Sequence, residues 1–261
     1  MRGAIVRMHW LASVCLLAGL FLSTPAVQAG SYDRLFQAAK VDNDSAIREL
    51  LAAGLDPNLI EEERGDTALI LALREDSMRV VTALLASPSI DLEVRARNGD
   101  SALMIAAFKA NLPAVKALLV RGALVNRPDN RPGWSALHYA AAVGNNAILQ
   151  LLLEKKAAVD ALAPNKTTAL MMAARGGHIL SVKLLLDHGA DPLLVNDQGY
   201  DAIAMAKLFN NKDIVEGLEY RIAKIRKQRE ATTAANPEKT AVPGQPAEAG
   251  DKPQTPASPA K

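Results

Sequence analysis

Gly-Trp-Ser-Ala-Leu-His-Tyr-Ala-Ala, at residues 133–141, is one of five related blocks that decide the fold. The blocks begin at residues 65, 99, 133, 166 and 199, so successive starts lie 34, 34, 33 and 33 residues apart. A period of this length is typical of arrays in which each unit packs mainly on its neighbours. The sequence therefore predicts a repeat array over about residues 31–220.

Each block predicts a short helix, a turn and a second helix. A second apolar stretch follows each block, as at residues 80–85 and 181–186. Helices of about eight residues are unstable alone, so each must pack on its neighbour. Each first helix begins at a side chain that can cap its free amides, and glycines end several second helices where a left-handed backbone is needed. The capping residues are Thr67, Ser101, Ser135, Thr168 and Asp201, and the glycines are Gly54, Gly122 and Gly189.

These blocks resemble the ankyrin repeat, whose pattern Gly-x-Thr-Pro-Leu-His, then Ala-Ala and later Leu-Leu-Gly-Ala-Asp, is similar to residues 133–141 and 185–191. The resemblance implies an all-α solenoid of about six helix-turn-helix units with short hairpin loops. Alanine replaces the expected proline in all five blocks, and the histidine occurs only at His138. By the resemblance, the ring of His138 bonds the neighbouring turn. Two turns depart from the glycine pattern, at residues 87–89 and at Lys156.

The domain organisation follows from the repeat boundaries. We expect an N-terminal capping repeat at residues 30–62 and four central repeats at 63–196. A C-terminal capping repeat at 197–230 ends in a helical extension, where residues 220–229 include five basic side chains. Residues 231–261 are chiefly Pro, Ala, Lys, Thr, Glu and Gln without apolar periodicity, and such a composition predicts a disordered tail.

Residues 1–29 have the pattern of a secretory signal peptide. Arg2 and Arg7 precede an apolar stretch at residues 10–22, and small residues occupy the cleavage positions before Gly30. Thirteen residues are too short a helix to cross a hydrocarbon core of ~30 Å. We expect cleavage near Ala29, no integral membrane segment afterwards, and a periplasmic or secreted protein. Secretion in a eukaryote stays an alternative, because residues 43–45 and 165–167 match the glycosylation triplet.

Composition excludes several classes of function. The chain has 30 Lys and Arg against 28 Asp and Glu, and residues 1–29 hold two of the basic residues and no acid. The mature chain is therefore neutral, which argues against nucleic-acid binding, since that needs a basic excess. The only cysteine of the full sequence, Cys15, lies in the predicted signal peptide. The mature chain therefore has no thiol for catalysis, disulfides or metal binding.

No residues combine into a catalytic, cofactor or metal site. Hydrolysis needs a nucleophile beside a base, and a metal site needs several ligands converging on one point. Only His138, His178 and His188 remain after cleavage, and each occupies a position where histidine is framework in ankyrin repeats. The acidic run at 61–63 lies on a predicted exposed loop, where adjacent side chains point apart. We predict that the protein is not an enzyme and needs no cofactor.

The resemblance implies that a partner protein binds a concave surface of hairpin tips and first helices. Trp, Tyr and Arg side chains dominate the binding energy of protein interfaces, and several of them fall at these positions. Packing of Trp134 against the adjacent hairpin loop stays an alternative to an interface role. The predicted partner-binding residues are Asp66, Arg74, Glu75, Asp100, Phe108, Lys109, Trp134, Arg175 and Tyr200.

The predicted function is that of a monomeric, non-enzymatic, exported scaffold that binds another protein. Acidic side chains gather in the first full repeat and basic side chains further along, which would orient a partner of opposite polarity. Two alternatives stay open. The protein could be an immunity-type inhibitor that covers the active site of a toxin or enzyme, or an envelope-attached structural protein held by its basic helix and tail.

Overall fold

Twelve helices make up the described residues of the computed structural model, which are 25–126 and 133–235. Each unit contributes two helices in chain order. They are α1 (Pro25–Lys40), α2 (Asp44–Ala52), α3 (Ala68–Arg74), α4 (Met78–Leu85), α5 (Ala102–Phe108), α6 (Leu112–Val120), α7 (Ala136–Val143), α8 (Asn146–Glu154), α9 (Ala169–Gly176), α10 (Ile179–Asp187), α11 (Ala202–Leu208) and α12 (Lys212–Ala235). The predicted all-α repeat architecture is confirmed.

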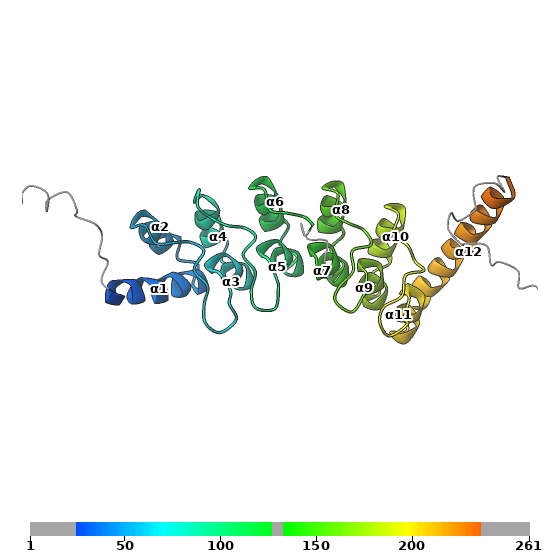
Figure 1. Cartoon of the computed structure of the whole chain (residues 1–261), viewed down its shortest axis with the longest axis horizontal. Helices are drawn as coiled ribbons and strands as arrows, with labels where there is room; N and C mark the ends of the chain where they lie inside the picture. The colour runs from blue at the N-terminus through cyan, green and yellow to red at the C-terminus, as the bar shows by residue number, and fades with distance from the viewer. Residues whose placement is uncertain (1–24, 127–132, 236–261) are drawn as a thin grey trace, which may run out of the picture. The chain divides into compact units, whose positions relative to one another are not determined.

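The helices of the array form two rows (Figure 1). The first-helix row contains α1, α3, α5, α7, α9 and α11, and the second-helix row contains α2, α4, α6, α8 and α10. Loops such as those before α3 and α5 project beyond the first-helix row. We call the exposed ends of α3, α5, α7, α9 and α11, together with these loops, the first-helix face.

Side-chain caps explain where the first helices begin. In all five blocks the predicted capping oxygen accepts a hydrogen bond from the backbone N–H three residues later. The distances are 3.2 Å at Thr67, 3.4 Å at Ser101, 3.4 Å at Ser135, 3.3 Å at Thr168 and 2.7 Å at Asp201. Since the cap replaces a missing helical acceptor, it sets the helix start locally.

Most turns after the second helices take the predicted left-handed backbone. Gly122 has a φ of 93°, and Lys156 takes the same turn with a φ of 65° although it carries a side chain. The turn at residues 87–89 contains no residue with a positive φ, and it is bonded to the preceding repeat. Asn58 donates to the backbone O of Ser89 (2.9 Å) and accepts from the N–H of Asp91 (2.7 Å).

The core is a layer of small and branched apolar side chains between successive repeats. The alanines that follow each block are fully buried, which allows the paired helices to approach closely, and leucines fill the space between units. Burying one leucine contributes ~1.5–3 kcal/mol. The alanines are Ala72, Ala106, Ala140, Ala173 and Ala206, and the matching leucines are Leu69, Leu103, Leu137 and Leu170.

A ladder of side-chain hydrogen bonds links each loop to the next. Asn58, Glu93, Asn126 and Asp160 each accept from a backbone N–H 31 to 33 residues later. Their partners are Asp91 (2.7 Å), Leu124 (2.8 Å), Ala158 (2.8 Å) and Asp191 (3.0 Å). The ladder therefore joins neighbouring repeats only.

The first and last helices run across two of the predicted domain boundaries. Helix α1 begins at Pro25 and so includes the predicted cleavage position at Ala29, while residues 1–24 lie outside the described part. Helix α12 continues to Ala235, past the predicted start of the tail at residue 231, and residues 236–261 are not described. The array through Glu216 is one compact unit, and the chain from Gly217 belongs to a second. Among the described helices, none is both long and apolar enough to span a membrane.

Candidate protein-binding surface

The nine predicted partner-binding residues differ widely in exposure. The side chains of Glu75, Phe108, Arg175 and Tyr200 are exposed, those of Arg74, Lys109 and Trp134 are half-buried, and those of Asp66 and Asp100 are buried. Seven of the nine can therefore reach a partner directly. Whether they do so stays a prediction.

The two buried carboxylates hold neighbouring repeats together. Arg74 pairs with Asp66 of its own repeat at 2.8 Å and with Asp100 of the next repeat at 3.6 Å. Asp100 also accepts hydrogen bonds from the hydroxyl of Tyr139 (2.7 Å) and from Asn98 (2.7 Å). Because Asp66 and Asp100 are enclosed, they can act on a partner only through the placement of Arg74 and Tyr139.

Tyr139 is a functional candidate that the sequence did not single out. Burial, and then its hydrogen bond to the charged Asp100, raise the pKa of its phenol well above the ordinary value, so the hydroxyl remains a donor. Its repeat position holds Leu71 and Ile105 in the two preceding repeats. An aromatic residue at a position otherwise filled by aliphatic ones was the signal that could have identified it.

Tyr139 is the middle of an aromatic strip that crosses two repeats. The ring centroid of Phe108 lies 5.7 Å from that of Tyr139 at an interplanar angle of 72°, and that of Trp134 lies 6.0 Å away on a tilted plane. Edge-to-face and tilted pairs of this kind are favourable. The side chain of Phe108 is 51% exposed, so the strip presents a rigid apolar surface to solvent.

His138 supports this strip from inside. Its Nε2 lies 3.0 Å from the backbone O of Thr167 in the next repeat, its Nδ1 lies 2.7 Å from the hydroxyl of Ser135, and its ring is 5.5 Å from that of Trp134. The predicted bond to the neighbouring turn is thus confirmed. Burial lowers the pKa of His138 from 6.5 to about 4, so the ring is neutral at physiological pH.

Arg175 occupies the first-helix face two repeats beyond Phe108. Its guanidinium carbon lies 4.9 Å from the centroid of the Phe209 ring, at cation–π distance. The amide of Asn211 donates to the backbone O of Arg175 at 3.0 Å. The end of α9 is therefore tied to the following repeat, and the guanidinium is held over an aromatic face.

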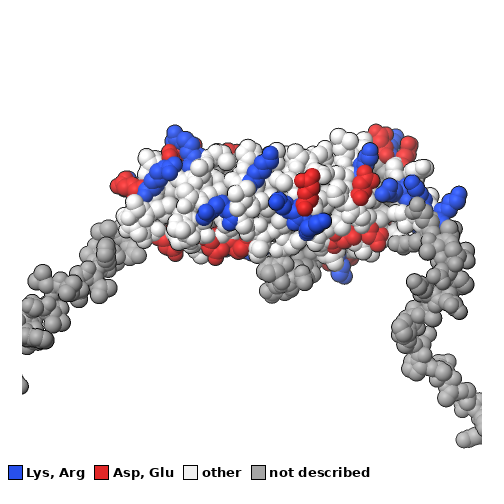
Figure 2. Space-filling model, turned by 90° about the horizontal axis from the view of Figure 1, so that it is seen from above, with Lys and Arg blue, Asp and Glu red and all other residues white. Residues whose placement is uncertain are grey.

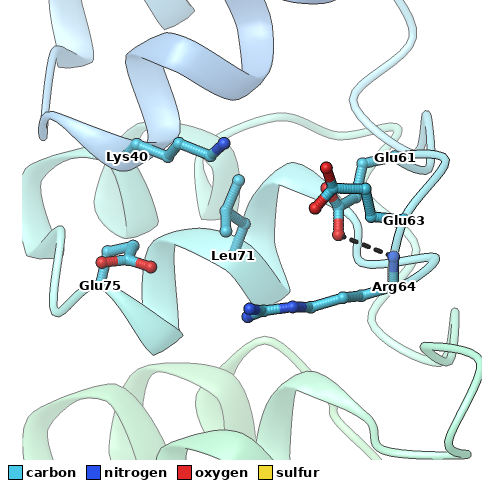
Figure 3. Close-up of a pocket in the computed structure, with 6 residues that line it drawn as sticks. All are labelled: Lys40, Glu61, Glu63, Arg64, Leu71 and Glu75. Carbon is cyan, nitrogen blue, oxygen red and sulfur yellow. Dashed lines mark hydrogen bonds between the residues drawn. The ribbon is translucent and has the colours of Figure 1, made fainter.

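A pocket of about 310 Å³ opens near the beginning of the array (Figure 3). It lies between the end of α1, the loop before α3 and α3 itself, and Lys40 and Arg64 reach into it from two sides. The backbone N–H of Arg64 donates to Glu61 at 3.1 Å. The other lining residues are Glu63, Leu71 and Glu75. Because charges of both signs line it, the pocket suits polar contacts more than an apolar ligand.

The side of the array that carries the second-helix row has charged side chains of both signs. Figure 2 shows Lys and Arg interspersed with Asp and Glu on this side. Mixed charges of this kind are typical of a solvated surface. Within the described residues no group of three His, Cys, Asp or Glu could hold a metal ion, and every buried side-chain N or O atom has a hydrogen-bond partner.

Comparison with known proteins identifies the repeat. A protein-family model described as ankyrin repeats (3 copies) matches residues 35–129, 103–196 and 137–229. The chain belongs to the ankyrin-repeat family. The matched residues contain the array and most of the predicted C-terminal repeat, so the resemblance drawn from residues 133–141 and 185–191 is confirmed.

Among solved structures, the chain is similar to the ankyrin repeat domain of Bcl-3, described as a unique member of the IkappaB protein family. The two are 31% identical, with a TM-score of 0.57, and the match covers 69% of this chain and 81% of the other. A search of curated proteins gives no match. Ankyrin repeats are generally scaffolds for protein–protein interaction, so the first-helix face of this ankyrin array is its candidate binding surface.

Proposed function

We propose that this ankyrin array is a non-enzymatic, monomeric scaffold that binds one partner protein through its first-helix face in the periplasm. The observation that carries the proposal is the aromatic strip of Phe108, Tyr139 and Trp134. Aromatic side chains of this kind are the usual centres of binding energy at protein interfaces. The buried Arg74–Asp100–Tyr139 network supports it, because a strip that is already ordered loses little conformational entropy on binding.

Export to the periplasm is proposed from the sequence. The basic start, the apolar stretch at residues 10–22 and the small residues before Gly30 support signal-peptide cleavage. A protein without cysteine after cleavage also suits an oxidising compartment. The partner is then expected among exported proteins, either as a supported enzyme or as an inhibited toxin.

Affinity capture from a periplasmic extract tests the proposal. A triple variant with Phe108→Ala, Trp134→Ala and Arg175→Ala removes three predicted partner-binding side chains of the first-helix face, of which Trp134 is half-buried. Its matched control, with Val120→Ala, Leu180→Ala and Lys183→Ala, removes exposed side chains of α6 and α10 in the second-helix row. We expect the full chain and the control to retain one protein that the first-helix variant loses.

Circular dichroism of all three proteins checks that they are folded. Equal recovery by the wild type and the first-helix variant would contradict the proposed surface, and so would loss by the control alone. If the captured protein is an enzyme, its activity with and without the array separates a supporting scaffold from an inhibitor.

A further inference from the structure

Arg74 and Arg175 occupy the same repeat position with different surroundings. Each lies nine residues after the start of its block, at residues 65 and 166. Around Arg74 the array supplies two carboxylates, Asp66 from the same repeat and Asp100 from the next. The corresponding positions around Arg175 hold Thr167 and Tyr200. The array therefore places carboxylates around the arginine of one repeat and none at the corresponding positions around the arginine of the other.

Arg175 is nevertheless held in place. Phe209 lies under its guanidinium at 4.9 Å, and Asn211 fixes the backbone of its residue. Throughout the described residues, the guanidinium has no acidic partner within ion-pair distance. A stacked guanidinium still offers its N–H groups at the edge of the plane, where a carboxylate can bind in a bidentate manner.

The ends of α7 and α9 lie close together beside Arg175, and the His178 ring contacts both. A Cβ atom at Gly176 would lie 3.3 Å from the backbone O of Ala142, so the ends of α9 and α7 are in close contact. Val143, at the end of α7, is 36% exposed, and Tyr139 lies one turn earlier on the same helix. A bound segment can therefore reach Arg175 and the aromatic strip together.

We propose that Arg175 forms an ion pair with a carboxylate of the partner protein. This carboxylate would take the place that Asp66 and Asp100 have beside Arg74. This inference rests on the proposed protein-binding function and names the chemistry of the partner. The partner presents an acidic segment in which an Asp or Glu side chain pairs with Arg175. Neighbouring apolar side chains of that segment pack on Phe108, Tyr139 and Trp134.

A random dodecapeptide display library is the probe for this inference. It is selected in parallel on the full wild-type chain, on Arg175→Gln and on Lys183→Gln, which removes an exposed cation from α10 in the second-helix row. We expect Asp and Glu to be enriched at least severalfold beside apolar residues on the wild type. The acidic enrichment should persist with Lys183→Gln and disappear with Arg175→Gln.

A second pair of variants leaves Arg175 in place. Tyr200→Asp supplies an internal carboxylate at the position equivalent to Asp100, whereas Tyr200→Asn changes the same side chain without adding charge. We expect the acidic enrichment to be lower on Tyr200→Asp than on Tyr200→Asn, so that the comparison separates the added charge from the loss of Tyr200 itself. For a selected acidic peptide, fluorescence of Trp134 in a Trp10→Phe chain, where it is the only tryptophan, should report at least tenfold weaker binding in Arg175→Gln.

Four results would overturn the inference. Enrichment of basic residues, or acidic enrichment that survives Arg175→Gln, would exclude the ion pair. Apolar enrichment that Phe108→Ala removes, without any acidic residue, would refute the role of Arg175 and leave the protein-binding face intact. Absence of enrichment on every chain would count against the inference and the proposed binding face together.

Discussion

At the scale of single residues, some of the predicted partner-binding positions are buried and support the first-helix face from inside instead of lying on its surface. Asp66 and Asp100 follow a turn glycine, which in a single repeat predicts a surface position. The structure buries both: Asp66 pairs with Arg74 of its own repeat, whereas Asp100 is bonded by Arg74 of the preceding repeat and by Tyr139, 39 residues later. At Asp100, contacts between repeats decided this outcome, and the pattern within one repeat contains no trace of them.

His138 predicts a specific pH dependence of stability. Its folded pKa of about 4 lies below the unfolded value of about 6.5, so the unfolded chain binds more protons between these values. The stability that neutral His138 provides is present above about pH 6.5 and is lost as the pH falls through about 4. The loss amounts to up to about 3 kcal/mol.

Urea unfolding at pH 7.5 and pH 4.5 measures this dependence in the wild type and in His138→Asn. We expect the wild type to lose more stability on acidification than the variant, although the variant is less stable at pH 7.5. An equal loss of unfolding free energy on acidification in the two proteins would show that His138 does not titrate with the shifted pKa.

At the scale of helices, the sequence predicted the starts well because a cap acts over three residues. Thr67, Ser101, Ser135, Thr168 and Asp201 all form the expected bond. The turn at residues 87–89 was harder to predict, since it has no glycine and takes no left-handed backbone. The end of α12 at Ala235 also differs from the composition-based boundary at residue 231, because residues 231–235 include three alanines, which favour helix.

Removal of one cap should destabilise the array measurably. Thr168→Ala leaves the N–H of Met171 without its 3.3 Å acceptor at the start of α9 and should cost about 1 kcal/mol. Thr82→Ala is the matched control, because the exposed Thr82 bonds through its hydroxyl within α4 and alanine has the higher helix propensity. Chemical denaturation should give a change near zero for the control, and an equal loss in both variants would contradict the capping role.

At the scale of the molecule, charge distinguishes a diffusing scaffold from an envelope-attached protein. Helix α12 presents exposed Lys224 and Lys227 in its second half, although the chain after residue 29 has equal numbers of basic and acidic residues. Stable attachment to an anionic surface needs a clear basic excess, and each cation near such a surface contributes ~1 kcal/mol. From this balance of charge we expect a freely diffusing protein.

Fractionation of the full chain tests this expectation. We expect osmotic shock to release the wild type and a Lys224→Glu, Lys227→Glu variant equally. Envelope-bound wild type that the double charge reversal releases would favour the structural alternative instead. Partner capture by the same two proteins shows whether the first-helix face works independently of α12.

The ladder of hydrogen bonds between loops determines how the array responds to a pulling force. Asn58, Glu93, Asn126 and Asp160 each bind only the next loop, so no single contact fastens the first repeat to the last. Under tension from its ends, such a chain would yield one unit after another, and each released unit of about 33 residues would add ~110 Å of length. The outer repeats pack on a neighbour at one side only, so they should yield before the central repeats that carry the aromatic strip.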